Sequence, residues 1–252
     1  DTSGSREPRK NVNVNAGGGQ NALLKENFHV DISTSDGITP LMAAAAAGKA
    51  EAVAVLLAHG ACVGANNGMG KTALHLAAAS GDEGTVGVLL RYLQATREGT
   101  QEPMDIATDT STDTAQRNPY EYSLEFVLEA ASGDDGETAL HVAAVHGHAH
   151  IARQLLAAGA LTSAPLAISH ESALHVAAMK GWPEVARALI EGGADLEQKS
   201  ASEQTALHAA IIFGHEAVAE LLLKHGARAD SVWRRGASAL HEASGKGLDR
   251  VI

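Results

Sequence analysis

The chain has 252 residues, of which 45% are hydrophobic but only 3% aromatic, and alanine is the most frequent residue. Because an alanine side chain buries little area, this composition argues against one thick central core and favours thin layers of closely packed helices. The net charge of −11 argues against broad binding to a phosphate backbone, which needs a basic surface. The longest apolar runs, such as residues 41–47, are far shorter than a membrane span.

Cys62 is the single cysteine, so an internal disulfide framework is excluded and a reducing compartment is favoured. The chain has no Asn-x-Ser/Thr sequon, and its start at Asp1 lacks the basic and apolar pattern of a signal peptide. We therefore expect an intracellular protein, cytoplasmic or nuclear. Because the sequence does not begin with methionine, we expect a segment of a longer protein.

Residues 1–16 are polar, and we expect them to be flexible. Further along the chain one short block recurs, in which Thr or Ser is followed by Ala or Pro, then Leu, then His or Met, then a variable residue, then alanine. The block begins at positions 39, 72, 138, 172, 205 and 238, with spacings of 33, 66, 34, 33 and 33 residues. A repeat of this length indicates a solenoid of stacked units.

Other residues keep the same spacing from the first residue of each block. A glycine follows nine positions later, a Leu-Leu or Leu-Ile pair follows at seventeen and eighteen in five copies, and a second glycine follows at twenty-one in four copies. Each unit therefore predicts a helix capped by Thr or Ser, a glycine turn, a second helix, a glycine stop and an extended hairpin.

This repeat resembles the ankyrin-repeat family, whose signature is a 33-residue period with Thr-Pro-Leu-His-x-Ala. The resemblance covers residues 30–252 and implies an all-α solenoid of stacked helix-turn-helix units with short β-hairpin loops. Repeats 1–2 are expected at 32–93 and repeats 3–6 at 132–252, the last one incomplete. Leu23-Leu24 lies thirty-three residues before Leu56-Leu57, so residues 17–31 predict a degenerate leading half-repeat.

An acidic insertion at residues 94–131 interrupts the repeat, because a further copy there would lack both its capping Thr and its turn glycine. The part at 94–117 is rich in Thr and Asp and predicts a loop. Residues 120–131 predict a helix with one apolar face formed by Leu124, Val127 and Leu128. The insertion is either a solvated surface loop or an acidic docking element open to phosphorylation, and both interpretations stay open here.

Three features of the sequence bear on catalysis or ligand binding. Gly68 to Thr72 resembles the end of a phosphate-binding loop, but Ala65 stands where that motif needs its first glycine. The alternating histidines at 146, 148 and 150 do not share one helix face, and Cys62 lies in a linker. The resemblance implies that the signature histidines form hydrogen bonds that order the hairpins. We expect no catalytic, metal-binding or cofactor-binding residue and no small-molecule substrate.

In ankyrin repeats, partners mainly contact the hairpin tips and the two residues before the turn glycine, so the resemblance implies a binding surface on the concave face. Its candidate residues in this chain are Met69, Lys71, Val145, His146, Met179, Lys180, Ile212, Phe213, Trp233, Arg234 and Arg235. An apolar strip across three repeats is predicted at Val145, Met179, Ile212 and Phe213. The alternative is that Ile212 or Phe213 packs inward, and Trp182 can equally be a packing residue.

The expected function is a non-catalytic module that binds a partner protein, as a monomer within a larger protein, without binding nucleic acid or a membrane. Two alternatives stay open. One is a regulatory or substrate-recruiting domain of an enzyme whose catalytic domain lies outside this segment, and the other is a structural spacer. Fold alone does not decide between them.

Overall fold

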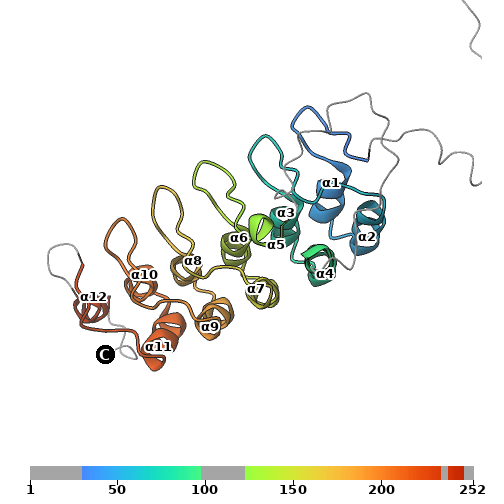
Figure 1. Cartoon of the computed structure of the whole chain (residues 1–252). Helices are drawn as coiled ribbons and strands as arrows, with labels where there is room; N and C mark the ends of the chain where they lie inside the picture. Colours follow the sequence, from blue (N-terminus) through green and yellow to red (C-terminus); the bar gives the residue numbers. More distant parts are fainter. Residues whose placement is uncertain (1–29, 98–122, 234–237, 247–252) are drawn as a thin grey trace, which may run out of the picture.

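The computed structural model describes residues 30–97, 123–233 and 238–246, which form a curved stack of helix-turn-helix units (Figure 1). The first helix of each unit lies in one row, formed by α1 (Pro40–Ala46), α3 (Ala73–Ser80), α6 (Ala139–His146), α8 (Ala173–Lys180), α10 (Ala206–Phe213) and α12 (Ala239–Lys246). The second helices form a parallel row of α2 (Ala50–Ala58), α4 (Glu83–Arg97), α7 (Ala149–Ala157), α9 (Pro183–Glu191) and α11 (Glu216–Lys224). We call these the inner and the outer row.

Hairpin loops project from the same side of every unit, next to the inner row (Figure 1). Among the described residues the loops pair only through isolated antiparallel bridges, at Asn66 with Thr72, Ser132 with Glu137 and Val232 with Ser238. The described part of the chain therefore contains helices and no continuous sheet, which confirms the expected all-α solenoid with short hairpins.

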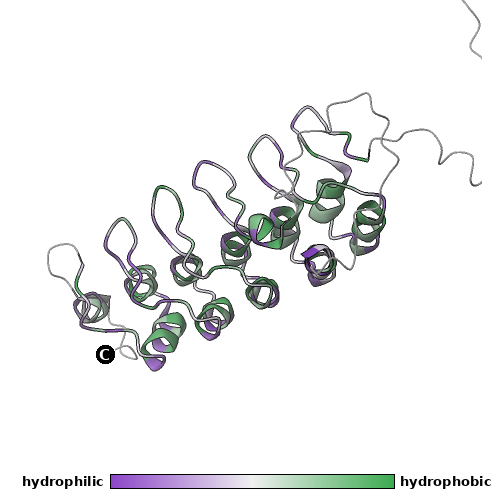
Figure 2. Ribbon diagram, viewed as in Figure 1, coloured by the Kyte–Doolittle hydropathy of each residue, from purple (hydrophilic) through white to green (hydrophobic). Residues whose placement is uncertain are grey.

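The core is thin and runs the length of the stack, as the alanine-rich composition predicts. The inner helices α3, α6, α8 and α10 each bury an alanine completely against the neighbouring helices at the fifth position after the capping residue: Ala77, Ala143, Ala177 and Ala210. One leucine in each of the outer helices α4, α7, α9 and α11 is equally buried, at Leu89, Leu155, Leu189 and Leu222. The small inner side chains let helices approach closely while the leucines supply most of the apolar area. In Figure 2 hydrophobic residues are concentrated in the helices.

The turn between the two helices of a unit depends on glycine. Gly81, Gly147, Gly181 and Gly214 end their inner helices in the left-handed region, with φ of 81°, 78°, 74° and 76°. A side chain would strain this conformation, so glycine is the residue that allows the chain to reverse there.

The stack continues across the acidic insertion. Helix α3 packs on α6, and α4 packs on α7, so the second and third described units are neighbours although a long segment separates them in sequence. Helix α4 runs on to Arg97, which corrects the expectation that residues 94–97 belong to a loop.

A short helix, α5 (Leu124–Leu128), returns the chain to the stack. Its buried residues are Leu124, Val127 and Leu128, the apolar face expected from the sequence. The helix is shorter than the predicted 120–131, of which 120–122 lie outside the described residues. Residues 129–131 are not helical. Glu129 is the C-cap of α5, and the Ser132 N–H beyond it donates to Glu137 O within the next hairpin.

Several expectations fall on residues outside the described part of the chain. These are the segments at 1–16 and 17–29, the loop at 98–117, the residues Arg234 and Arg235, and the chain beyond Lys246. Within the described residues, every helix is too short or too polar to cross a membrane.

Candidate protein-binding surface

The recurring histidine closes the start of each inner helix. The Thr72 side chain accepts the backbone N–H of His75, and His75 Nδ1 accepts the backbone N–H of Thr72 at 3.2 Å. Equivalent pairs form at Thr138–His141, Ser172–His175 and Thr205–His208. Two backbone donors that an isolated helix would leave without partners are thereby satisfied.

The other nitrogen of each histidine reaches the next hairpin. Because Nδ1 accepts a hydrogen bond, Nε2 carries the hydrogen and donates to a backbone carbonyl. His75 donates to Glu137 O at 2.9 Å, and His175 donates to Gln204 O at 3.0 Å. His141 and His208 make the same kind of bond to Glu171 O and Ser231 O. Each histidine thus positions the loop of the following unit, as the family resemblance implied.

Burial keeps these histidines neutral. Removal from water lowers the pKa of His75, His175 and His208, and it lowers the pKa of His141 to about 4. Desolvation disfavours the charged imidazolium, and protonation at Nδ1 would also set two donors against each other. The base of the hairpins therefore carries no histidine charge near neutral pH.

A second set of contacts links the outer helices α7, α9 and α11 to the unit before each of them. In these units the side chain of the residue after the turn glycine hydrogen-bonds to a backbone carbonyl of the preceding unit. That carbonyl belongs to the residue two positions before the turn glycine of the preceding unit. His215 Nε2 donates to Met179 O at 2.9 Å, and Trp182 Nε1 donates to Val145 O at 3.3 Å. His148 Nε2 lies 3.4 Å from Ala79 O. These bonds fix the backbone of two residues of the predicted strip, Val145 and Met179.

The rings of the same residues lie against the previous turn glycine. A Cβ atom on Gly147 would lie 2.9 Å from the Trp182 indole, and one on Gly81 would lie 2.7 Å from the His148 ring. Glycine is therefore required there for space as well as for its dihedral angles. Sequence reasoning missed this contact, although the glycine and the polar or aromatic residue after it recur together at 147–148, 181–182 and 214–215.

The predicted apolar strip lies at equivalent places on three successive inner helices. Val145, Met179 and Ile212 are half-buried, whereas the Phe213 side chain is 56% exposed. The inward-facing places of α10 are taken by Leu207 and Ile211, which are fully buried. Phe213 therefore does not belong to the core, and the strip is open to solvent at its C-terminal end.

The remaining candidate residues differ in exposure. Met69 at a hairpin tip is 62% exposed, Lys180 and His146 are exposed, and Lys71 is half-buried. Trp233 is half-buried, with its ring centroid 6.0 Å from that of His208, so it packs on the signature histidine. The structure brings Lys71, Val145 and His146 together around a small cavity of about 60 Å³ beneath the strip.

The glycine-lysine segment is a hairpin tip with occupied donors. The Asn67 side chain accepts the N–H groups of Met69 and Lys71 at 3.0 and 2.9 Å, and the Asn67 carbonyl accepts that of Gly70. The N–H of Thr72 donates to His75. A phosphate-binding loop needs these groups free to face the phosphates, so this segment is built for a turn.

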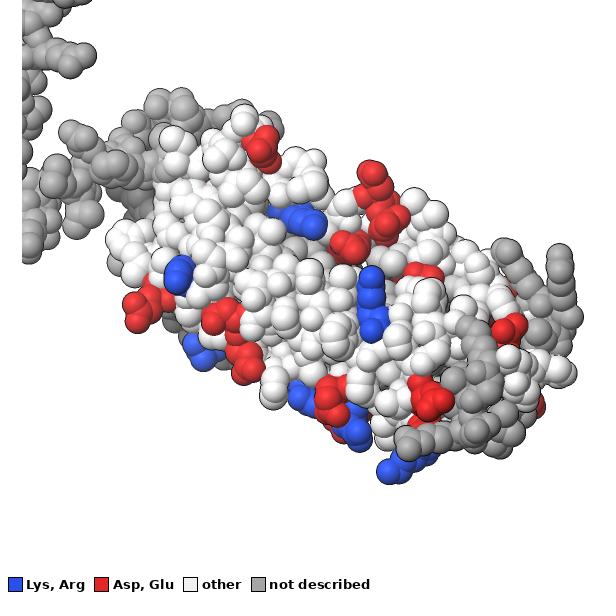
Figure 3. Space-filling model, turned by 180° about the vertical axis from the view of Figure 1, so that it is seen from behind, with Lys and Arg blue, Asp and Glu red and all other residues white. Residues whose placement is uncertain are grey.

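Charges of both signs are interspersed on the face that Figure 3 shows, and neither sign forms a continuous patch there. In the part of the chain that the structure describes, no three His, Cys, Asp or Glu side chains are grouped to hold a metal ion.

Comparison with known proteins decides the family. The family model described as "Ankyrin repeats (3 copies)" matches residues 14–98, 114–200, 158–232 and 174–251, which together span most of the chain. The chain belongs to the ankyrin-repeat family. Among solved structures it is similar to the crystal structure of the ankyrin repeat domain of Bcl-3, described as a unique member of the IkappaB protein family, with 25% identity and a TM-score of 0.68. That match covers 88% of this ankyrin-repeat chain and 85% of the Bcl-3 chain, whereas no curated protein sequence matches.

Proposed function

We propose that the chain is a non-catalytic module that binds a partner protein through the concave side of its ankyrin stack, as a monomer and as part of a larger intracellular protein, cytoplasmic or nuclear. Ankyrin repeats are protein-interaction modules, and the similar domain of Bcl-3 has the same architecture. The acidic net charge supports a protein partner over a nucleic acid.

The observation that carries the proposal is the exposed Phe213 at the end of a strip with a rigid backbone. Exposed aromatic residues in an apolar setting are typical hot spots of protein interfaces. The carbonyls of Val145 and Met179 are held by Trp182 and His215, so the strip loses little conformational freedom when a partner binds. A preformed apolar surface gains more affinity per contact than a flexible one.

Site-specific cross-linking tests the proposal. A photoreactive phenylalanine analogue at position 213 or 179 is expected to cross-link one protein partner in cell extract, whereas the same analogue at Glu191, on the exposed end of outer helix α9, is expected to cross-link much less of it. The identified partner is then purified, and its affinity is measured by calorimetry for the natural chain and for Phe213→Ala.

The alternatives give different results. A structural spacer would cross-link no partner above the level of the Glu191 control. Equal cross-linking at 213 and 191 would place the interface away from the concave side and overturn the proposal. For a regulatory or substrate-recruiting domain of an enzyme, the concave strip would still bind, and the reading frame around this segment would encode the catalytic domain.

A further inference from the structure

Two hairpin tips hold a residue with a side chain where three others hold glycine. In the hairpins before α1, α3, α6, α8 and α10, the second residue before the capping Thr or Ser has a left-handed backbone. It is glycine in the first three, with φ of 78° at Gly37, 74° at Gly70 and 68° at Gly136. In the last two it is His170, with φ of 54°, and Glu203, with φ of 61°.

This conformation lowers stability when the residue has a Cβ atom. In the left-handed region Cβ lies too close to the following carbonyl oxygen, and besides glycine mainly Asn, Asp and His enter it. Glu203 is therefore the more strained of the two residues. Both side chains are exposed and form no hydrogen bond or ion pair with any residue that the structure describes, so no contact there offsets the strain. Strain of this kind is typical of residues that contact a ligand.

The two strained residues lie on one rigid edge of the stack. The Ala201 N–H donates to Ser169 O at 2.8 Å, which joins the two tips. The Ala167 N–H donates to Asp135 O at 2.7 Å, which joins them to the hairpin before α6. Ile168 lies between Ala167 and Ser169, and its side chain is 67% exposed. We call Ile168 and the two strained residues the tip edge.

The charge around the tip edge indicates what it binds. Segments 132–138, 166–172 and 198–204 of these three hairpins hold five carboxylates and one lysine, Lys199. Asp135 and Glu203 are both exposed, and neither forms an ion pair within the described part of the chain. A complementary surface therefore has an apolar side chain to cover Ile168, flanked by lysine or arginine.

From these observations we propose that the tip edge binds a basic segment of the partner protein, which places an apolar side chain on Ile168 and a cation against Glu203. The inference rests on the proposed function, because inner helices α8 and α10 of the same units carry Met179 and Phe213 of the apolar strip. One partner thus contacts the strip and the tip edge together. The stability that is lost at the two tips is retained as specificity for this partner.

Glycine substitution in the full chain tests the strain. Glu203→Gly is expected to raise the melting temperature by about 1–4 °C, because it relieves the left-handed Cβ but makes the unfolded chain more flexible. Gly136→Ala is the reverse change at the equivalent position, where the new Cβ would come no closer than 3.4 Å to its neighbours. It is expected to lower the melting temperature by a similar amount. A Glu203→Gly chain that is no more stable than the natural chain would overturn the proposal.

Fluorescence anisotropy tests the binding with two labelled synthetic peptides. In one peptide a leucine is flanked on each side by two arginines, and in the other by two glutamates. We expect the arginine peptide to bind the natural chain at least about tenfold more tightly than the glutamate peptide. Glu203→Gln is expected to weaken the arginine peptide about threefold at an unchanged melting temperature, and Glu203→Lys about tenfold. Glu191→Lys, the matched change of charge on outer helix α9, is expected to have little effect.

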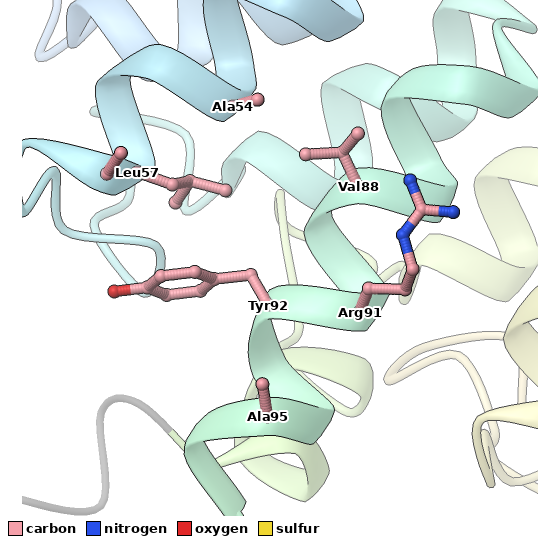
Figure 4. A pocket seen from close by; sticks show the side chains of 7 residues that line it. Ala54, Leu57, Val88, Arg91, Tyr92 and Ala95 are labelled. Atoms are coloured by element: carbon pink, nitrogen blue, oxygen red, sulfur yellow. The ribbon is translucent and has the colours of Figure 1, made fainter. Parts of the chain in front are cut away.

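The outer row supplies a second control. An open groove of about 320 Å³ lies between α2 and α4, where Leu57 points toward Val88 and Tyr92 (Figure 4). Apolar side chains also fit there, so Val88→Asp is expected to leave the affinity for the arginine peptide unchanged. Loss of binding in Val88→Asp but not in Glu203→Lys would place the segment on the outer row and overturn the proposal.

The same variants are measured with the protein that cross-links at position 213. If Phe213→Ala weakens that protein but Glu203→Lys acts no more than Glu191→Lys, the tip-edge proposal is wrong and the proposed function stands. If position 213 cross-links no protein, the proposed function fails, and the arginine peptide decides on the tip edge. Equal affinity of the natural chain for the two peptides would then overturn the inference.

Discussion

The indole N–H of Trp182 donates to the carbonyl oxygen of Val145 at 3.3 Å, and its ring lies over Gly147, so one side chain joins two neighbouring units. His215 makes the same connection to Met179 and Gly181 one unit further on. These contacts run beside the histidine bonds to the hairpins, so each junction among these units is fixed at both the turn and the loop.

Gly147→Ala is expected to destabilise the chain by about 2–4 kcal/mol, because the new Cβ would combine a left-handed backbone with a clash against Trp182. Gly159→Ala is the matched control, since Gly159 also has a positive φ, 100°, but open space around it among the described atoms. We expect about 1–2 kcal/mol there. Urea unfolding measures both, and adding Trp182→Ala should reduce the cost of Gly147→Ala toward the control. If Gly147→Ala costs the same with and without Trp182→Ala, the clash is contradicted.

Acid is expected to destabilise the stack through its buried histidines. The folded pKa of His141 is about 4, against 6.5 in the unfolded chain, so between these pH values the unfolded state binds more protons. The contribution of His141 to the free energy of unfolding is therefore fully present above pH 6.5. It is lost as the pH falls toward 4, by about 3 kcal/mol. His75, His175 and His208 act in the same direction.

The measurement is the free energy of unfolding in urea from pH 7.5 to pH 4, for the natural chain and for His141→Gln. The variant should show a shallower fall over this range, whatever its stability at neutral pH. An identical pH dependence in both chains would mean that His141 does not titrate as its burial predicts.

Phe213→Ala is expected to weaken partner binding by about 1–3 kcal/mol while leaving the melting temperature almost unchanged, because the side chain is largely exposed. Ile211→Ala, two residues away in the same helix, removes a fully buried side chain and should cost about 2–5 kcal/mol of stability. Calorimetry and thermal unfolding on the same samples separate the two effects. A large loss of stability in Phe213→Ala would assign that residue to the core.

ATP is expected not to bind at the glycine-lysine segment, because the N–H groups of Met69, Gly70, Lys71 and Thr72 already have acceptors within the hairpin. Calorimetry with ATP and magnesium should show no saturable heat. Micromolar affinity that disappears in Lys71→Ala would contradict this expectation.

The sequence predicts the fold well because its repeat is strict. Thr72 and His75, or Thr138 and His141, each mark a helix start at the same distance from a turn glycine, so helix order and spacing follow directly. The sequence predicts the end of α4 less well. Gln94 to Arg97 include no turn residue that would mark where the helix ends, and the packing of α4 on α7 cannot be read from the repeat pattern. The contact of Trp182 with Gly147 was missed because it joins residues thirty-five apart, and neither residue alone indicates it.

The direct packing of α3 on α6 has a consequence for the order in which the chain folds. The connection from Arg97 to Ala139 is about three times as long as that from Ala157 to Ala173, which adds only about 1 kcal/mol of chain entropy to that one junction. Contacts between the first two units and the later four units close a larger loop, so we expect the two groups of units to nucleate separately. Cooperativity along the array should therefore be weakest at this junction. We expect folding to spread through the four C-terminal units before these units pack on the first two.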